Sequence, residues 1–144
     1  MKTPDYNDIS PTNGIDLDER SAAKIFLGKT QEEAIDIFAK NACLHVDCLR
    51  YMGENAFSYY FPAIIPYLES EKSVGDAEII LDINSIINTR LEHQIKSIKL
   101  TIKEILYTLD YIMINYDKFD PYPHRFKNLK KKIKILYTKI KILE

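Results

Sequence analysis

The longest segment without glycine or proline, residues 76–120, places the strongest constraint on the fold. Within it, apolar side chains recur at alternating spacings of four and three residues: Leu91, Ile95, Ile98, Ile102, Ile105, Leu109, Ile112 and Tyr116. This spacing puts them on one face of an α-helix. The segment therefore predicts a long central helix against which the rest of the chain packs.

The length of this predicted helix raises a question of continuity. A single helix of about 40 residues would extend about 60 Å, which is long for a compact domain of 144 residues. A break at Ser97 or Thr101 is one alternative, because residues 101–104 have the form of a capping box. A continuous or bent helix is the other, because the apolar spacing keeps its phase across both positions. The sequence leaves the two alternatives open.

A second segment with the same spacing follows. Pro121 and Pro123 predict a turn over residues 117–124. After the turn, apolar residues again alternate at spacings of three and four: Phe126, Leu129, Ile133, Leu136, Ile140 and Leu143. Two such helices joined by a short turn predict a C-terminal antiparallel αα-hairpin, with Leu143 near Ile98.

The N-terminal half contains helix boundaries that can be assigned from capping residues. Residues 1–15 predict an irregular arm. Residues 16–19 and 30–33 have the form of capping boxes, which start helices near residues 17 and 31. Gly28 ends the first of these helices, because glycine tolerates the left-handed conformation that follows a helix.

The second of these helices and the segment after it are less regular. One helix over residues 31–52 is predicted, with a kink near Asn41 as an alternative. In residues 54–70, Pro62 and Pro66 exclude a single regular helix. We expect a short helix that ends near Tyr60, a break, and one or two further turns up to Leu68.

No segment predicts a sheet, so the fold class is all-α. We predict a single-domain helical bundle of five to six helices over residues 16–144, preceded by the arm at 1–15. No apolar run is long enough to cross a membrane, and the first residues lack the apolar core of a secretory signal. Cys43 and Cys48 are spaced so that one helix directs them apart. A reduced, cytoplasmic protein is expected.

The net charge of −1 is unevenly distributed. Residues 1–72 carry 7 basic and 12 acidic side chains, a net charge of −5, whereas residues 73–144 carry 13 and 9, a net charge of +4. This asymmetry would serve internal packing, self-association or a charged partner. We favour internal packing of the two halves.

No motif predicts catalysis, a metal or a cofactor. Residues 23–30 match a permissive phosphate-loop pattern, but bulky side chains occupy its variable positions, and the end of a helix at Gly28 explains them. Cys43, His45 and Cys48 diverge on one helix and lack a second ligand pair, so we predict no metal site. No nucleophile or acid–base pair is recognisable, and we expect no catalytic residue and no cofactor.

An aromatic segment beside the two prolines is the first candidate for function. Its six aromatic residues either pack in the core or form a partly exposed patch that binds a partner protein. They are Tyr51, Phe57, Tyr59, Tyr60, Phe61 and Tyr67.

A lysine-rich C-terminal helix is the second candidate. A solvated helix face, or contact with the acidic half, is the simpler interpretation. Binding of a polyanion is the alternative, although scarce arginine and the slightly acidic net charge argue against nucleic acid. The residues for this alternative are Lys127, Lys130, Lys131, Lys134 and Lys141.

Part of the chain resembles a known pattern. Its residues are Phe26-Leu27-Gly28-Lys29-Thr30, Glu32-Glu33-Ala34, Tyr59-Tyr60, Pro62-Ala63, Tyr67-Leu68 and Ser70. Over about residues 26–70, this pattern resembles a block that recurs in a family of small, uncharacterised bacterial proteins. The resemblance implies no activity.

These observations lead to one expected function and one alternative. We expect a non-enzymatic helical protein that binds a partner protein, such as an immunity protein that neutralises a toxin, or an adaptor. The alternative is polyanion binding through the C-terminal lysines. A homodimer formed through the hairpin is compatible with both, and no membrane association is expected.

Overall fold

The structure is a computed structural model that describes residues 2–121 and 125–144. Over these residues it contains helices and no strand, which confirms the all-α prediction. The predicted turn at 117–124 lies partly outside the described residues, because residues 122–124 are not among them. The helical segments are more numerous and shorter than the five to six predicted, since local breaks divide several of the expected helices.

The N-terminal segment is more ordered than an irregular arm. Helix α1 (Tyr6–Ile9) is a single turn whose capping box is formed by Asp5 and Asp8. Ile9 is fully buried, and the Asp8 carbonyl accepts a hydrogen bond of 3.0 Å from the Gly53 amide. The segment is thereby attached to a distant part of the chain.

Helix α2 (Leu17–Phe26) starts at the predicted residue but with different contacts. The Asp16 carboxylate accepts hydrogen bonds from the amides of Asp18 and Glu19, as an N-cap does. The Glu19 side chain does not return to Asp16, so this half of the predicted capping box is wrong. Its carboxylate instead accepts hydrogen bonds from the Ser10 hydroxyl and from the amide and hydroxyl of Thr12. These contacts fasten the segment before α2 onto the helix itself.

Helix α3 (Gln31–His45) confirms the second capping box, since Thr30 and Glu33 bond reciprocally. The backbone kinks at Asn41, where φ is −158° and ψ is 77°. The regular α-helical hydrogen bonding ends at Val46, although the backbone keeps helical angles there, and α4 (Cys48–Tyr51) follows as a separate helix. The predicted single helix over 31–52 is therefore two helices, of which the first is kinked.

The proline-containing segment follows the prediction closely. Helix α5 (Glu54–Tyr60) ends at Tyr60 and continues as a 3₁₀ turn, η1 (Phe61–Ile64), into α6 (Ile65–Glu69). Pro62 lies in the first turn of η1 and Pro66 in the first turn of α6. A missing amide is tolerated in a first turn, because those amides have no partner within the helix. A second 3₁₀ turn, η2 (Glu71–Ser73), leads into the long segment.

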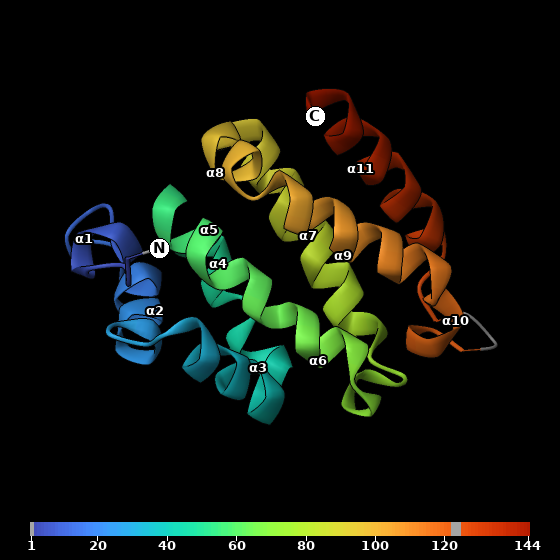
Figure 1. The fold of residues 1–144 in the computed structure, drawn as a ribbon, viewed down its shortest axis with the longest axis horizontal. Coiled ribbons are helices and arrows are strands. Elements are labelled where there is room, and N and C mark those ends of the chain that lie inside the picture. Colours follow the sequence, from blue (N-terminus) through green and yellow to red (C-terminus); the bar gives the residue numbers. More distant parts are fainter. Residues whose placement is uncertain (1, 122–124) are drawn as a thin grey trace.

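The predicted long central helix is divided into α7 (Ala77–His93), α8 (Ile95–Leu100) and α9 (Ile102–Ile114), with α10 (Tyr116–Phe119) after it. The backbone leaves the helical region at Gln94, where φ is −145°, and at Thr101, where φ is −120°. Thr101 is one of the two predicted break sites, although its hydroxyl does not cap α9. At the other predicted site, Ser97 donates its hydroxyl to the Gln94 carbonyl at 2.7 Å, so the break precedes it. Figure 1 shows that α9 runs in a different direction from α7.

Helix α11 (Leu129–Leu143) packs mainly against α9 and also contacts α7. Four of its apolar residues are buried there: Leu129, Ile133, Leu136 and Ile140. Figure 1 shows α1, α2 and α3 at one side of the molecule and α9 and α11 at the other, with α5, α6 and α7 between them. Helix α11 therefore forms an outer edge of the fold.

Three hydrogen bonds of Lys118 connect α10 to α6, to α9 and to the loop before α7. The Lys118 ammonium donates to the Leu68 carbonyl at 2.6 Å and to the Tyr111 hydroxyl at 2.9 Å. The Gly75 amide donates to the Lys118 carbonyl at 2.9 Å. We call these contacts the Lys118 latch; the bond to Leu68 joins residues 50 positions apart in the chain.

A buried arginine connects α7 to the junction of α4 and α5. Arg90 is 1% exposed, and its Nη2 donates hydrogen bonds to the carbonyls of Leu49 and Met52. The guanidinium lies 4.4 Å from the centre of the Phe57 ring. These carbonyls lie in the last turn and at the C-cap of α4, so Arg90 supplies hydrogen bonds that the end of this short helix lacks.

Candidate interaction surface

The aromatic segment does not form an exposed patch. Five of its six residues are buried in the core, and Tyr51 is half-buried. The buried five are Phe57, Tyr59, Tyr60, Phe61 and Tyr67. The structure thus places these side chains where the core-packing interpretation expects them, and they present almost no area to a partner.

The contacts of this segment explain its aromatic content. The Tyr60 hydroxyl lies 2.8 Å from the Phe26 carbonyl and 2.7 Å from the Lys29 carbonyl, at the end of α2. Burial raises the pKa of Tyr60 to about 12, so it remains a donor at neutral pH. The Tyr67 hydroxyl donates to the Asp76 carboxylate at 2.6 Å. Both tyrosines therefore satisfy helix ends and the N-cap of α7 while they fill the core.

The lysines of the second candidate are all exposed on α11 or just before it. This holds for the five predicted residues and for two further lysines of the helix. The seven are Lys127, Lys130, Lys131, Lys132, Lys134, Lys139 and Lys141. Lys141 forms an ion pair of 2.6 Å with Glu144, which raises the pKa of its ammonium group.

Helix α11 carries a second row of residues on the face opposite its buried row. We call Lys131, Ile135, Thr138 and Ile142 the outer row; all four are exposed, with Ile135 at 48% and Ile142 at 79%. Their spacing of four, three and four residues keeps them on one face of the helix. Lys134 and Lys141 follow one edge of this row, and Lys132 and Lys139 follow the other.

The basic face of α11 is not neutralised by the acidic half of the chain. Among the described residues, each ion pair joins two residues of the same half, as Arg50–Asp47 and Arg125–Glu78 do. Helices α2 and α3, which carry many of the acidic residues, lie at the side of the molecule away from α11 (Figure 1). Internal charge pairing, the favoured interpretation of the charge asymmetry, is therefore not seen in the described residues.

An open groove of about 250 Å³ lies between α7 and α11, beside the outer row. Its walls include Ile135 and Lys139 of α11, and Asn84 and Asn88 of α7. The Asn88 side-chain amide donates to the Asn84 carbonyl at 2.8 Å, within α7. A side chain of a partner that contacts Ile135 would find room in this groove.

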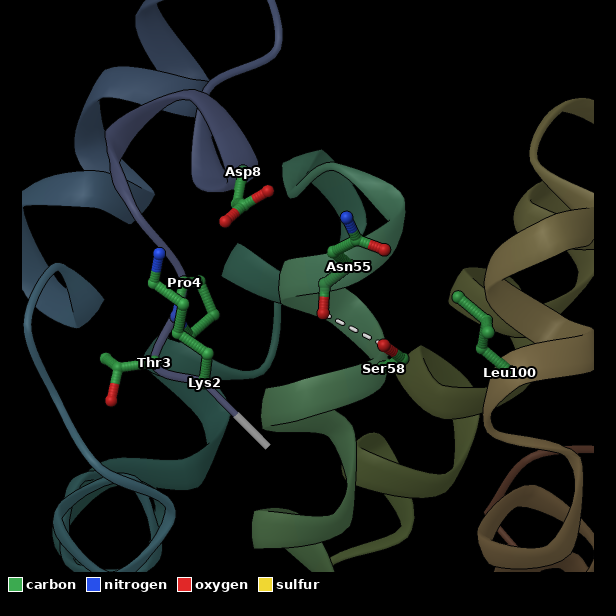
Figure 2. A pocket seen from close by; sticks show the side chains of 7 residues that line it. All are labelled: Lys2, Thr3, Pro4, Asp8, Asn55, Ser58 and Leu100. Atoms are coloured by element: carbon green, nitrogen blue, oxygen red, sulfur yellow. Dashed lines mark hydrogen bonds between the residues drawn. The ribbon is translucent and has the colours of Figure 1, made fainter.

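A larger cavity, of about 320 Å³, lies between the N-terminal segment, α5 and α8. Figure 2 shows Lys2, Thr3 and Pro4 on one side and Leu100 on the other, with α5 between them. Two of its polar side chains, those of Ser58 and Asp8, already form hydrogen bonds within the fold. Ser58 donates its hydroxyl to the Asn55 carbonyl at 2.9 Å. The Asp8 carboxylate accepts from the Asp5 amide at 2.9 Å. The cavity therefore presents no group of converging side chains that identifies a ligand.

The described part of the chain contains no group of three histidine, cysteine or acidic residues that could hold a metal. Cys43 and Cys48 are free thiols. None of the described helices has the length and apolar content that a bilayer crossing requires.

The exposed lysines of α11 were predicted from the sequence, whereas its outer row was not. Ile135 and Ile142 do not belong to the longer apolar repeat that ends at Leu143, so they stand outside the stripe used to predict the helix. The signal was present as a second repeat, offset by two residues from the first. This second repeat indicates a binding surface only once the structure shows that α9 and α7 cover the first repeat and leave the second exposed.

Comparison with models of protein families, with curated proteins and with solved structures gives no match to this chain.

Proposed function

We propose that this protein works without catalysis, by binding a partner protein through the outward face of α11. In this proposal α9 and α11 act as a hairpin, in which α9 packs against the buried face of α11 and leaves the opposite face free. The observation that carries the proposal is the combination of exposed lysines with the exposed apolar side chains of Ile135 and Ile142 on one face. The proposal moves the binding site away from the aromatic segment, whose side chains are buried.

The composition of this face favours a protein over a nucleic acid. Ile135 and Ile142 offer apolar area, which protein interfaces bury at their centre and which phosphate contacts do not use. Helix α11 contains no arginine, the residue that most often forms bidentate contacts with phosphates and bases. The acidic N-terminal half would also repel a long polyanion.

The proposed role is that of a neutralising immunity protein or an adaptor in the cytoplasm. Either role needs one accessible surface that recognises one partner, and neither needs a catalytic group. The free thiols of Cys43 and Cys48 suit a reducing compartment.

A charge-reversal variant tests the proposal. Tagged wild-type protein and the Lys131→Glu/Lys134→Glu variant would each be used to retain proteins from a lysate of the native host, with quantitative mass spectrometry as the readout. We expect at least one protein to be retained by the wild type and lost with the variant. The control is Lys24→Glu/Lys40→Glu, which makes the same change of charge at exposed lysines of the acidic half. If no retained protein distinguishes the two variants, the proposal is wrong.

Polyanion binding remains the second candidate because seven exposed lysines lie on or beside one helix. It predicts binding of mixed duplex DNA or RNA whose affinity falls steeply with salt, since each neutralised phosphate releases counterions. Fluorescence anisotropy at several salt concentrations measures this slope. A weak, flat response would remove the candidate.

A further inference from the structure

The outer row and its flanking lysines fit the positions of a heptad repeat. If Ile135 and Ile142 take the a positions, Lys131 and Thr138 take the d positions. The same register places Lys134 and Lys141 at g, and Lys132 and Lys139 at e. In coiled coils, a and d form the seam between two helices, and e and g form the ion pairs that select the partner.

We propose that the partner of this protein presents an acidic amphipathic α-helix, which packs along the outer row of α11. This inference rests on the proposed function and specifies its partner. The four lysines at e and g are all exposed and all positive, so they call for glutamate or aspartate at the facing positions of the partner. The apolar seam of that helix would cover Ile135 and Ile142, which solvent now reaches.

The same four lysines argue against a second copy of this chain as the occupant. Two α11 helices packed through their outer rows would bring lysines together on both edges of the seam. Like charges at these positions oppose pairing and are a common device for excluding self-association. The only acidic residue on α11 or at its end is Glu144, which already pairs with Lys141.

The supporting structure is suited to this contact. Helix α11 is held by its inner row, since Leu129, Ile133, Leu136 and Ile140 are buried against α9 and α7. The groove between α7 and α11 offers space beside Ile135 for a side chain from the partner, at the edge of the seam. The polar d positions, Lys131 and Thr138, would limit the affinity and define the register.

Synthetic peptides test the inference directly. The probe is a fluorescein-labelled peptide of about three heptads, with leucine at a and d and glutamate at e and g. A second peptide carries lysine at e and g, and a third has the composition of the first in an order that breaks the heptad. Anisotropy at low peptide concentration measures binding to the full chain. We expect binding of the first peptide only.

Matched variants locate the contact. Ile135→Asn/Ile142→Asn should weaken binding of the acidic peptide by about tenfold or more, as loss of central interface contacts does. The control Ile15→Asn/Leu17→Asn replaces two apolar residues that are also highly exposed, at 84% and 70%, in the acidic half. Its affinity should change by less than about twofold, because surface residues outside an interface contribute little. Circular dichroism verifies that both variants fold.

Each remaining outcome overturns the inference. Equal binding of the acidic peptide and its reordered form would mean that charge alone acts, without a helical seam. Self-association of the wild type through the outer row, seen by sedimentation and abolished by Ile135→Asn/Ile142→Asn, would make a second copy the occupant. Binding of duplex DNA without binding of any peptide would favour the polyanion. If lysate retention depends on Lys131 and Lys134 but the acidic peptide neither binds nor competes, the inference fails and the proposed function stands.

Discussion

Arg90 is the largest side chain that the core encloses fully, and it is a cation. Burial lowers its pKa to about 10, so it stays charged at neutral pH. Its hydrogen bonds to the carbonyls of Leu49 and Met52 and its contact with the Phe57 ring replace part of the lost hydration. The other two guanidinium nitrogens, Nε and Nη1, are buried without a hydrogen-bond partner, so the bonds of Nη2 and the ring contact offset only part of the cost of burying the charge.

We therefore expect Arg90→Ala to lower the free energy of unfolding by about 3 kcal/mol or more, since it leaves a void and two buried carbonyls without donors. Arg90→Met, which retains most of the volume, should lose less. Urea denaturation, monitored by circular dichroism, measures the free energy of unfolding of both variants. Arg125→Ala serves as the control, because its exposed pair with Glu78 should contribute only about 1 kcal/mol or less. An Arg90→Met variant as stable as the wild type would contradict the capping role.

Asp82 gives the stability a defined pH dependence. Burial, and then the nearby charge of Asp47, raise the pKa of Asp82 above its ordinary value of 3.8. The native state thus binds this proton more tightly than the unfolded state does, and the contribution of Asp82 to stability increases as the pH falls through its folded pKa towards 3.8. Above that range, the ionised carboxylate destabilises the native state.

Asp82→Asn removes this unfavourable charge, so we expect a higher melting temperature than that of the wild type at pH 7. At pH 3 the carboxyl is protonated in both states, and the difference should vanish. Differential scanning fluorimetry measures the melting temperature at the two pH values. Asp110→Asn, a change at an exposed residue, is the control and should leave the melting temperature unchanged at both. A variant less stable than the wild type at pH 7 would show that Asp82 makes a favourable contact that outweighs its desolvation.

At the scale of elements, Gly53 determines how closely α1 approaches α5. Its φ of −64° is ordinary, so the backbone does not require glycine. A β-carbon at this position would, however, overlap the carbonyl oxygen of Asp8, to which the Gly53 amide is bonded. Glycine is needed here for close approach of two backbones.

Gly53→Ala should therefore push α1 away from α5 and destabilise the fold by about 1–3 kcal/mol, the usual cost of overpacking. Limited proteolysis should then cut the N-terminal segment earlier than in the wild type. Gly28→Ala is the comparison, because it has free space but a φ of +78°. That variant should lose about 1 kcal/mol through backbone strain without exposing α1. Equal protection of α1 in the Gly53→Ala variant would contradict the close-approach argument.

Helix boundaries were predictable where a local chemical signal marks them. Thr30 caps α3 because its hydroxyl can reach the Glu33 amide, and the kink at Asn41 and the break at Thr101 occur at predicted positions. The break at Gln94 had no such signal. Ile98 of α8 is buried as Ile87 of α7 is, but Ile95, a member of the predicted repeat that directly follows the break, is 44% exposed. The spacing of apolar residues indicates which face of a helix is covered, but it does not indicate whether the helix axis continues straight. Here the change of direction after α7 accompanies the packing of α8 on α5.

At the scale of the whole molecule, whether a side chain is buried or exposed could not be predicted, because burial depends on segments that are distant in the chain. The aromatic density around Tyr60 was visible in the sequence, but whether these rings lie inside or outside depends on segments that are distant in the chain, such as the end of α2. The lysines of α11 could be assigned to a helix face, whereas the importance of Ile135 emerged only with the packing of α9 and α7. Helix caps depend on neighbouring residues and can be predicted from them, whereas the exposure of a side chain depends on the assembled fold.

The Lys118 latch has a consequence for the kinetics of folding. Its bond to Leu68 joins α10 to α6, 50 residues earlier in the chain. The intervening chain must therefore be largely arranged before the latch can form, and we expect the latch to close after the transition state. Interactions that form late slow unfolding and leave the folding rate almost unchanged. Lys118→Met, which retains the apolar stem, should therefore raise the unfolding limb of a stopped-flow chevron while the folding limb stays in place. Equal slowing of folding would mean that the latch belongs to the nucleus. If only the unfolding limb responds, the latch determines how long the native state persists and leaves the rate at which that state forms unchanged.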